Sequence, residues 1–219
     1  MHCDESIECE TSIEGYKHEF SMDVLSFRNM FFQDLKLDYI FDYLLKNENP
    51  FHIAVHSKQT STCEEKSGII GFDLERIIKG FYLEDSINAE IYGLAIPGNK
   101  SYDKSKIAGF LGIENVNGRI KKTNKKLPVN MSYGTVHPFV NEDAFESLGL
   151  KYILFDKNYL AKRRADKNKI LDDFSFTTAD CSGYNNHQLS IQINYSDAFE
   201  IIKNKFGENR VKAVDLVNV

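Results

Sequence analysis

Two apolar segments separated by a short polar turn constrain the fold of this chain more than any other feature. Residues 77–83 and 89–96 are rich in Ile, Leu, Tyr and Phe, and the turn between them, residues 84–88, is polar. Strands joined by so few residues pair antiparallel, because a parallel pair needs a crossover of about a dozen residues. Helical patterns precede and follow this hairpin. We therefore predict an α+β fold with a mostly antiparallel sheet.

Local signals predict further elements on both sides of the hairpin. Thr62 and Glu65 have the spacing of a capping box, in which the Thr hydroxyl accepts from the Glu amide and the Glu carboxylate reaches back to the Thr amide, and Gly71 ends this helix. Alternation of apolar and polar residues is typical of strands, and apolar residues three or four apart are typical of helices. These patterns predict strands over 51–56, 151–155 and 189–193, one or two helices over 21–46, helices over 102–111, 141–148 and 196–206, no element over 114–132, and a loop or irregular helix over 156–173.

The length and the distribution of charge indicate one globular domain with an acidic extension. The chain has 219 residues, 42% of them hydrophobic, and a formal net charge of −5, which together are ordinary for a soluble globular protein. The first fifty residues alone carry a net charge of −7, so the remainder is slightly basic. We assign residues 1–36 to an acidic N-terminal extension that is partly helical or disordered, and residues 37–219 to the main domain.

The cysteines and the N-terminus predict a cytoplasmic protein. Its four cysteines are scattered without a C-x-x-C pair, which is typical of a reducing compartment. The first ten residues are acidic where signal and transit peptides are basic, and no apolar run approaches the ~18 residues that a membrane helix needs. We expect no membrane partner.

One basic segment could contact nucleic acid. Residues 119–169 contain twelve Lys and Arg residues against five acidic ones. Such an excess can pair with a phosphate backbone, although two solvated basic loops would have the same composition. The basic residues considered for RNA binding are Arg119, Lys121, Lys122, Lys125, Lys126, Arg163 and Arg164.

Familiar catalytic motifs are absent, and two features could carry chemistry. Lys79 begins an apolar strand, where a charge that faces inward needs a partner such as a substrate phosphate, although the side chain could also point to solvent. Residues 134–138 combine a Gly that permits close backbone approach with a Pro that stiffens the turn, so their amides could bind an oxyanion, although a plain turn has the same pattern. No Cys, His and carboxylate cluster suggests a metal, and we predict no cofactor.

Six short motifs in order make the chain resemble the YbaK/prolyl-tRNA editing-domain family of aminoacyl-tRNA deacylases. The resemblance runs from about residue 37 to residue 206. Its most specific part is a Lys seventeen residues after the Thr of a Thr-x-Glu-Glu helix, here Lys79 and Thr62. The other motifs are a strand that ends in Pro97-Gly98, a helix that ends in Leu111-Gly112, the loop Gly134-Thr135-Val136-His137-Pro138-Phe139, a strand that ends in Asp156, and a final strand and helix around Tyr195.

The resemblance implies a curved, mostly antiparallel sheet surrounded by helices and an enzyme that hydrolyses the ester of mischarged tRNA, alanyl- or cysteinyl-tRNA for proline. The implied partners are tRNA and prolyl-tRNA synthetase, with no DNA. The implied catalytic residues are Lys79, which holds the terminal phosphate or ribose, Gly134 and Thr135, whose amides face the ester carbonyl, and His137, which contacts the amino acid, orients water or only caps the turn. The implied substrate-binding residues are Thr62, Val136, Pro138, Asn185, Asn186 and His187.

Three departures from the family pattern leave alternatives open. Gly80 replaces the usual Thr after the Lys, His137 replaces a common Ser, and residues 185–188 replace a stretch of Asn-Thr-Ala-Thr. The alternatives are an inactive module that binds tRNA or docks on a protein, and the editing domain of a longer prolyl-tRNA synthetase.

Overall fold

The computed structural model describes eleven segments of the chain. They are residues 6–9, 20–23, 36–47, 49, 51–56, 60–114, 116–127, 131, 136–160, 174–181 and 187–218. The catalytic candidates Gly134 and Thr135 and the substrate-binding candidates Asn185 and Asn186 lie outside the described residues, as do Arg163 and Arg164.

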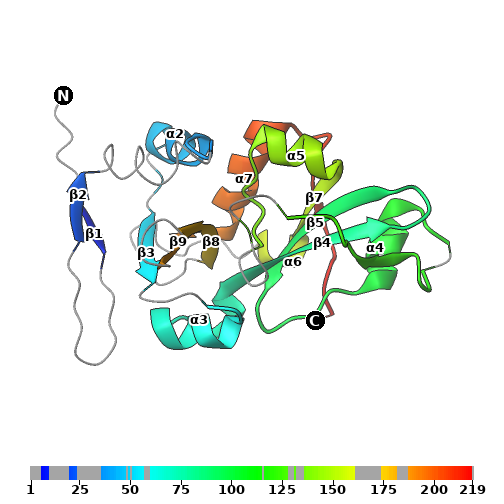
Figure 1. Ribbon diagram of the computed structural model, residues 1–219, viewed down its shortest axis with the longest axis horizontal. Helices are drawn as coiled ribbons and strands as arrows, with labels where there is room; N and C mark the ends of the chain where they lie inside the picture. Colours follow the sequence, from blue (N-terminus) through cyan, green and yellow to red (C-terminus); the bar gives the residue numbers. More distant parts are fainter. Residues whose placement is uncertain are drawn as a thin grey trace.

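One mixed sheet forms the centre of the described structure (Figure 1). Its order is β10-β7-β5-β4-β8-β9-β3, and β6 pairs with the end of β4, off this path. The ladders β4–β5, β4–β6, β8–β9 and β3–β9 are antiparallel, whereas β10–β7, β7–β5 and β4–β8 are parallel. The strands are β3 His52–His56, β4 Ile77–Asp85, β5 Glu90–Pro97, β6 Ile120–Lys122, β7 Leu150–Asp156, β8 Phe174–Cys181, β9 His187–Ile193 and β10 Val211–Val214.

Helices surround this sheet, which confirms the predicted α+β class. In the view of Figure 1, α5 and α7 lie on one side of the β4–β5 hairpin and α3 lies on the other, beside the beginning of β4. The helices are α2 Tyr39–Lys46, α3 Cys63–Ile70, the 3-10 turn η1 Leu74–Arg76, α4 Lys104–Leu111, α5 Glu142–Leu148, α6 Lys157–Leu160 and α7 Tyr195–Phe206. In the N-terminal extension, β1 Ser6–Cys9 pairs antiparallel with β2 Phe20–Asp23.

The hydrophobic core lies between the sheet and the helices, and one buried hydroxyl group links a helix to two strands of the sheet. Strand β5 is buried along nearly its whole length, as its near-continuous apolar sequence requires. Tyr195 at the start of α7 is fully buried, and its hydroxyl donates to the Ala95 carbonyl at 2.6 Å and accepts from the Asp156 amide at 2.9 Å. Thus α7, β5 and β7 are joined by hydrogen bonds as well as by apolar packing.

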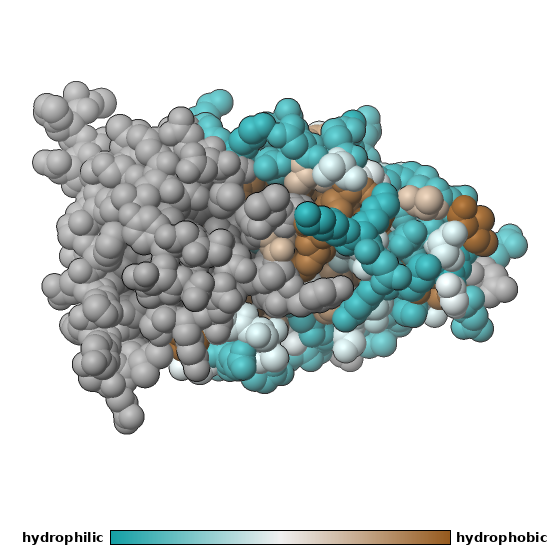
Figure 2. All heavy atoms as spheres, in the orientation of Figure 1, coloured by the Kyte–Doolittle hydropathy of each residue, from teal (hydrophilic) through white to brown (hydrophobic). Residues whose placement is uncertain are grey.

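The coloured part of Figure 2 shows a mostly hydrophilic outer face with smaller hydrophobic patches.

The local predictions hold where a cap or a tight turn marks the element. Strands β4 and β5 pair antiparallel as expected, with Lys79 opposite Ile96. The Thr62 hydroxyl accepts from the Glu65 amide at 3.1 Å, and the Glu65 carboxylate accepts from the amide of Ser61 at 2.7 Å rather than from that of Thr62. The predicted helices and strands after residue 100 also form, within a few residues of their expected bounds.

Three local predictions were wrong or incomplete, and each concerns β-strands. Residues 21–23, expected in a helix, end strand β2. Residues 120–122, in a segment expected to lack structure, form β6 against the end of β4. Strands β8 and β10 were not predicted: β8 pairs antiparallel with the next strand, β9, and the four-residue β10 depends on β7, which lies far earlier in the chain. The segment after Asp156, for which a loop or an irregular helix was expected, begins with helix α6, and residues 161–173 lie outside the described residues.

A buried ion pair holds the turn of the β4–β5 hairpin. The Asp85 carboxylate is fully buried, and the Arg119 guanidinium donates to its two oxygens at 2.7 and 2.8 Å. The amide of Ile87 in the turn donates to the same carboxylate at 3.0 Å. The hydrogen bonds from Arg119 lower the pKa of Asp85 to about 2. Arg119, a candidate for RNA binding, therefore has a structural partner in the folded protein.

We predict that Arg119→Gln destabilises the protein. Removing the guanidinium leaves a buried carboxylate without its charged partner, and we expect the free energy of unfolding in urea at pH 7 to fall by about 2 kcal/mol. The stability that Asp85 contributes is present above the unfolded pKa and is lost as the pH falls through about 2, so the difference between the variant and the wild type should shrink over that range. Lys121→Gln, at an exposed neighbour, is the control, and equal losses in the two variants would contradict the prediction.

Candidate functional site

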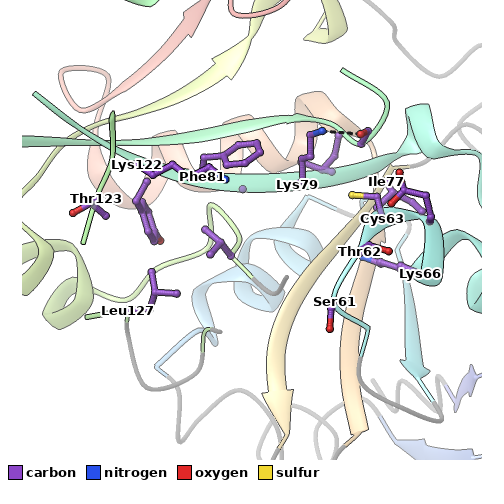
Figure 3. A pocket seen from close by; sticks show the side chains of 16 residues that line it. Ser61, Thr62, Cys63, Lys66, Ile77, Lys79, Phe81, Lys122, Thr123 and Leu127 are labelled. Atoms are coloured by element: carbon purple, nitrogen blue, oxygen red, sulfur yellow. Dashed lines mark hydrogen bonds between the residues drawn. The ribbon is translucent and has the colours of Figure 1, made fainter. Parts of the chain in front are cut away.

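A cavity of about 390 Å³ lies between the start of α3, the strand β4 and the segments that follow β5 and β6 (Figure 3). Its size is sufficient for a small polar ligand. Of the sequence candidates, Thr62, Lys79, Lys122 and Val136 line it together. These residues are far apart in the chain, so the fold assembles the four into one site.

Lys79 presents its amine at the cavity from strand β4. The pairing of Lys79 with Ile96 brings the end of β5 close, and the Lys79 amine donates to the Gly98 carbonyl at 2.7 Å (Figure 3). An ammonium group has three donors, so two remain after this bond. The hydrogen bond fixes the position of the charge while leaving it able to bind an anion.

Gly80 lets the loop around Val136 lie directly on β4. The Gly80 amide donates to the Val136 carbonyl at 3.0 Å. A Cβ at position 80 would lie 2.6 Å from the carbonyl carbon of Val136 and 2.9 Å from the amide nitrogen of His137, distances that no side chain tolerates. The departure from the usual Thr at this position is therefore a packing requirement of this loop. Pro138, in the same loop, is buried outside the cavity lining.

The His137 side chain is buried and is not part of the cavity lining. Its ring nitrogens have no hydrogen-bond partner of ordinary geometry among the described residues. Burial, and secondarily the charge of Lys66, lowers the pKa of His137 to about 3, while the backbone of Phe139 weakly opposes the shift. The imidazole is therefore neutral at neutral pH. Its backbone carbonyl accepts from the Tyr82 hydroxyl at 3.4 Å, so this residue joins the loop to β4.

Lys66 is a cavity residue that the sequence analysis missed. It lies on α3, three residues after Cys63, and only 3% of it is exposed. Burial lowers the pKa of the Lys66 ammonium to about 7, an effect that the nearby Cys63 thiol partly opposes. The signal was available, because Lys66 lies three residues before the buried Ile69 and so occupies the apolar face of the helix. The cavity lining thus includes a third lysine besides Lys79 and Lys122, and Lys66 is the most buried of the three.

Arg119, Lys121, Lys125 and Lys126 are not among the described residues that line the cavity. The Lys125 amine donates to the Leu148 carbonyl at 2.8 Å, where it satisfies the last turn of α5, and Lys121 and Lys126 are exposed. His187 begins strand β9, where its backbone pairs with Cys181. Among the described residues, no group of three or more His, Cys, Asp or Glu side chains is placed to hold a metal ion. None of the described helices has the length and apolar character required to span a membrane.

Comparisons with known proteins identify the fold. Comparison with protein-family models gives no match, and comparison with curated proteins gives none either. Similar solved structures include two that cover most of this chain. The hypothetical protein APE2540 is 16% identical, with a TM-score of 0.52 over 80% of this chain and 98% of the other. A candidate trans-editing enzyme for prolyl tRNA synthetase is 13% identical, with a TM-score of 0.52 over 84% of this chain and 97% of the other. Over this coverage the chain therefore shares its fold with these two proteins.

We predict that Gly80→Ala displaces the loop around Val136. The new methyl group would overlap the Val136 carbonyl, and we expect the free energy of unfolding in urea to fall by about 2 kcal/mol. Gly109→Ala is the matched control, because a Cβ at this position in α4 meets no atom within 4 Å. A Gly80→Ala variant as stable as Gly109→Ala would show that the close approach is not required.

We predict that Lys66 makes stability depend on pH above neutrality. The unfolded amine retains its proton up to a pKa near 10.5, whereas the folded amine releases it near pH 7, so the free energy of unfolding should rise with pH between these values. We expect a rise of about 2 kcal/mol between pH 7 and 9, measured by urea unfolding. Lys66→Met should remove this rise. An equal rise in both proteins would assign it to another group.

Proposed function

We propose that this protein is an aminoacyl-tRNA deacylase of the YbaK/prolyl-tRNA editing-domain family, which hydrolyses the ester between a wrong amino acid and the terminal ribose of a tRNA. The observation that carries the proposal is the Lys79 amine, held by the Gly98 carbonyl at a cavity whose wall includes Val136 of the family-like loop. Similarity in fold to a candidate trans-editing enzyme supports it. The finer proposal is that alanyl- or cysteinyl-tRNA for proline is the substrate, in the cytoplasm, with prolyl-tRNA synthetase as a partner.

The proposed reaction needs no covalent nucleophile, and its main requirement is that the ester is held in the correct position. Lys79 binds the terminal phosphate or ribose through its two remaining donors and holds the ester at the cavity. Water attacks the ester carbonyl, and the bond to the ribose oxygen breaks, which yields the free amino acid and the tRNA hydroxyl. In this proposal the amides of Gly134 and Thr135 stabilise the oxyanion, and Thr62 and Val136 contact the amino acid.

His137 has a positioning role in this proposal. A side chain that is buried, neutral and outside the cavity lining is poorly placed to contact the substrate or to transfer a proton. Its backbone, joined to Tyr82 beside the Gly80–Val136 contact, supports the loop instead. Of the three roles considered for His137, capping the turn is the one that this placement favours.

We predict that Lys79→Ala lowers the rate of deacylation about 100-fold, since a charge positioned at the reacting group contributes about this much. The assay compares wild type and variant on tRNA for proline charged with alanine, cysteine or proline. Lys46→Ala, which removes an exposed amine on α2, is the matched control.

The outcomes separate the alternatives. Equal rates for wild type and Lys79→Ala would contradict the role of Lys79. Binding of tRNA by the wild type without hydrolysis of any substrate would indicate a binding module, and neither binding nor hydrolysis would indicate a domain that docks on a protein.

A further inference from the structure

A second cavity, of about 290 Å³, lies beside the turn of the β4–β5 hairpin. The residues that line it come from this turn, from the end of α4 and from the first residues of β5, β7 and β10. None of its described lining residues also lines the cavity that contains Lys79. The two cavities are therefore separate sites.

Exposed apolar side chains lie at this second cavity. Among the described residues, the large hydrophobic side chains that are exposed are Leu45, Ile87 and Phe110. Phe110 is 40% exposed and lines the cavity, and Ile87 is 71% exposed in the turn between two lining residues, Asp85 and Asn88. Figure 2 shows a hydrophobic patch at the end of the molecule where Figure 1 places this turn. Apolar groups gathered around a cavity at the surface are typical of a binding site.

Aromatic rings give the cavity a preformed wall. The Phe110 ring contacts the Tyr152 ring edge to face, with the ring centres 5.8 Å apart. The Tyr152 ring lies nearly parallel to that of Tyr92 at 6.2 Å, and the buried Tyr92 is held by a hydrogen bond of 2.7 Å from its hydroxyl to Glu90. Rings that are fixed by their neighbours lose little conformational freedom when a ligand binds. This wall is therefore suited to pack against an apolar or aromatic side chain.

The charge at the cavity favours a ligand with a single carboxylate. Arg119 pairs with the Asp85 carboxylate, and Lys151 pairs with that of Glu90. Lys212 on β10 also lines the cavity, and it forms no hydrogen bond or ion pair with any described residue. One ammonium group without a partner can bind one carboxylate. A chain of phosphates would in addition bring negative charge close to Asp85 and Glu90, which is unfavourable.

We propose that this cavity is a docking site for a peptide segment of a partner protein, in which an aromatic side chain packs against Phe110 and Tyr152 and a neighbouring Asp or Glu pairs with Lys212. Ile87 adds apolar surface at the edge of the site. The exposed apolar groups indicate that the surface has a partner, and the charge identifies an acidic peptide as the kind of partner that fits. No residue of the Lys79 cavity takes part, so this site does not depend on the proposed function.

The experiment is an NMR titration of the whole chain with three acetylated peptide amides. Ala-Phe-Glu-Ala has the ring and the carboxylate, Ala-Phe-Gln-Ala lacks the carboxylate, and Ala-Ala-Glu-Ala lacks the ring. We expect the first peptide to bind about threefold more tightly than the second, as one solvent-exposed ion pair contributes, and about tenfold more tightly than the third. The preference for Glu over Gln should disappear at about 1 M NaCl, because salt screens the pair. A short oligouridylate tests the site for RNA.

Two pairs of variants assign the binding to these side chains. Lys212→Gln should bind the Glu and Gln peptides equally, whereas Lys104→Gln, which removes an exposed amine from the start of α4, should keep the preference. Phe110→Ala should lower the affinity for both Phe peptides about tenfold. Leu45→Ala, which truncates the exposed leucine of α2, should bind them as the wild type does. Ile87→Ala, at the most exposed of these positions, should weaken binding about threefold without affecting folding.

Three results would overturn the proposal. The first is that none of the peptides binds, and the second is a Lys212→Gln variant that still prefers the Glu peptide. The third is oligouridylate that binds at Phe110 more tightly than the Glu peptide does, which would assign the site to RNA. Deacylation of tRNA by Phe110→Ala and Lys212→Gln should equal that of the wild type, so the docking site and the proposed function succeed or fail in separate assays.

Discussion

The antiparallel ladder between β4 and β5 is the constraint on which the site depends. Its register places Lys79 opposite Ile96, and this brings the Gly98 carbonyl within 2.7 Å of the Lys79 amine. A shift of one residue in this register would turn the side chain of Lys79 to the opposite face of the sheet. The buried pair of Asp85 and Arg119 holds the far end of the same ladder, at the turn. Arg119, a residue of the basic segment, therefore stabilises the strand pairing that positions Lys79, although Arg119 is not among the described residues that line the cavity.

Gly80 is the second constraint, because its lack of a side chain lets the backbone of Val136 lie against β4 at the edge of the cavity. The carbonyl of Val136 occupies space that any side chain at position 80 would need. As a result the loop approaches β4 through backbone atoms, with an amide-to-carbonyl hydrogen bond of 3.0 Å. A contact of this kind is rigid, since neither partner has a rotamer to change. The absence of a side chain at position 80 thus preserves a close connection between β4 and the loop around Val136.

The sequence predicted those parts of the fold and site that depend on short-range interactions. Hydrogen bonds within four residues determine the cap at Thr62, and a four-residue turn determines the pairing of β4 with β5, so both are visible in the local pattern. Strand β10 has only four residues and depends on β7, about sixty residues earlier, which no local pattern records. Lys79 and Val136, which the resemblance assigned to one site, both line the cavity, whereas the burial of the His137 side chain depends on tertiary packing that the resemblance does not describe. Lys66 was missed because a lysine in a helix is ordinarily solvated, although its spacing from Ile69 placed it on the buried face of α3.

The three lysines that line the cavity differ in burial. Lys122 is exposed, Lys79 is half-buried and Lys66 is buried, with its pKa lowered to about 7. Burial also lowers the pKa of His137, to about 3, so its imidazole is neutral at neutral pH. Desolvation therefore reduces the positive charge at Lys66 near neutral pH. The formal net charge of −5 is a sum over the whole chain and does not describe the potential at the cavity, because three of the described residues that line the cavity are lysines and one, Glu64, is acidic.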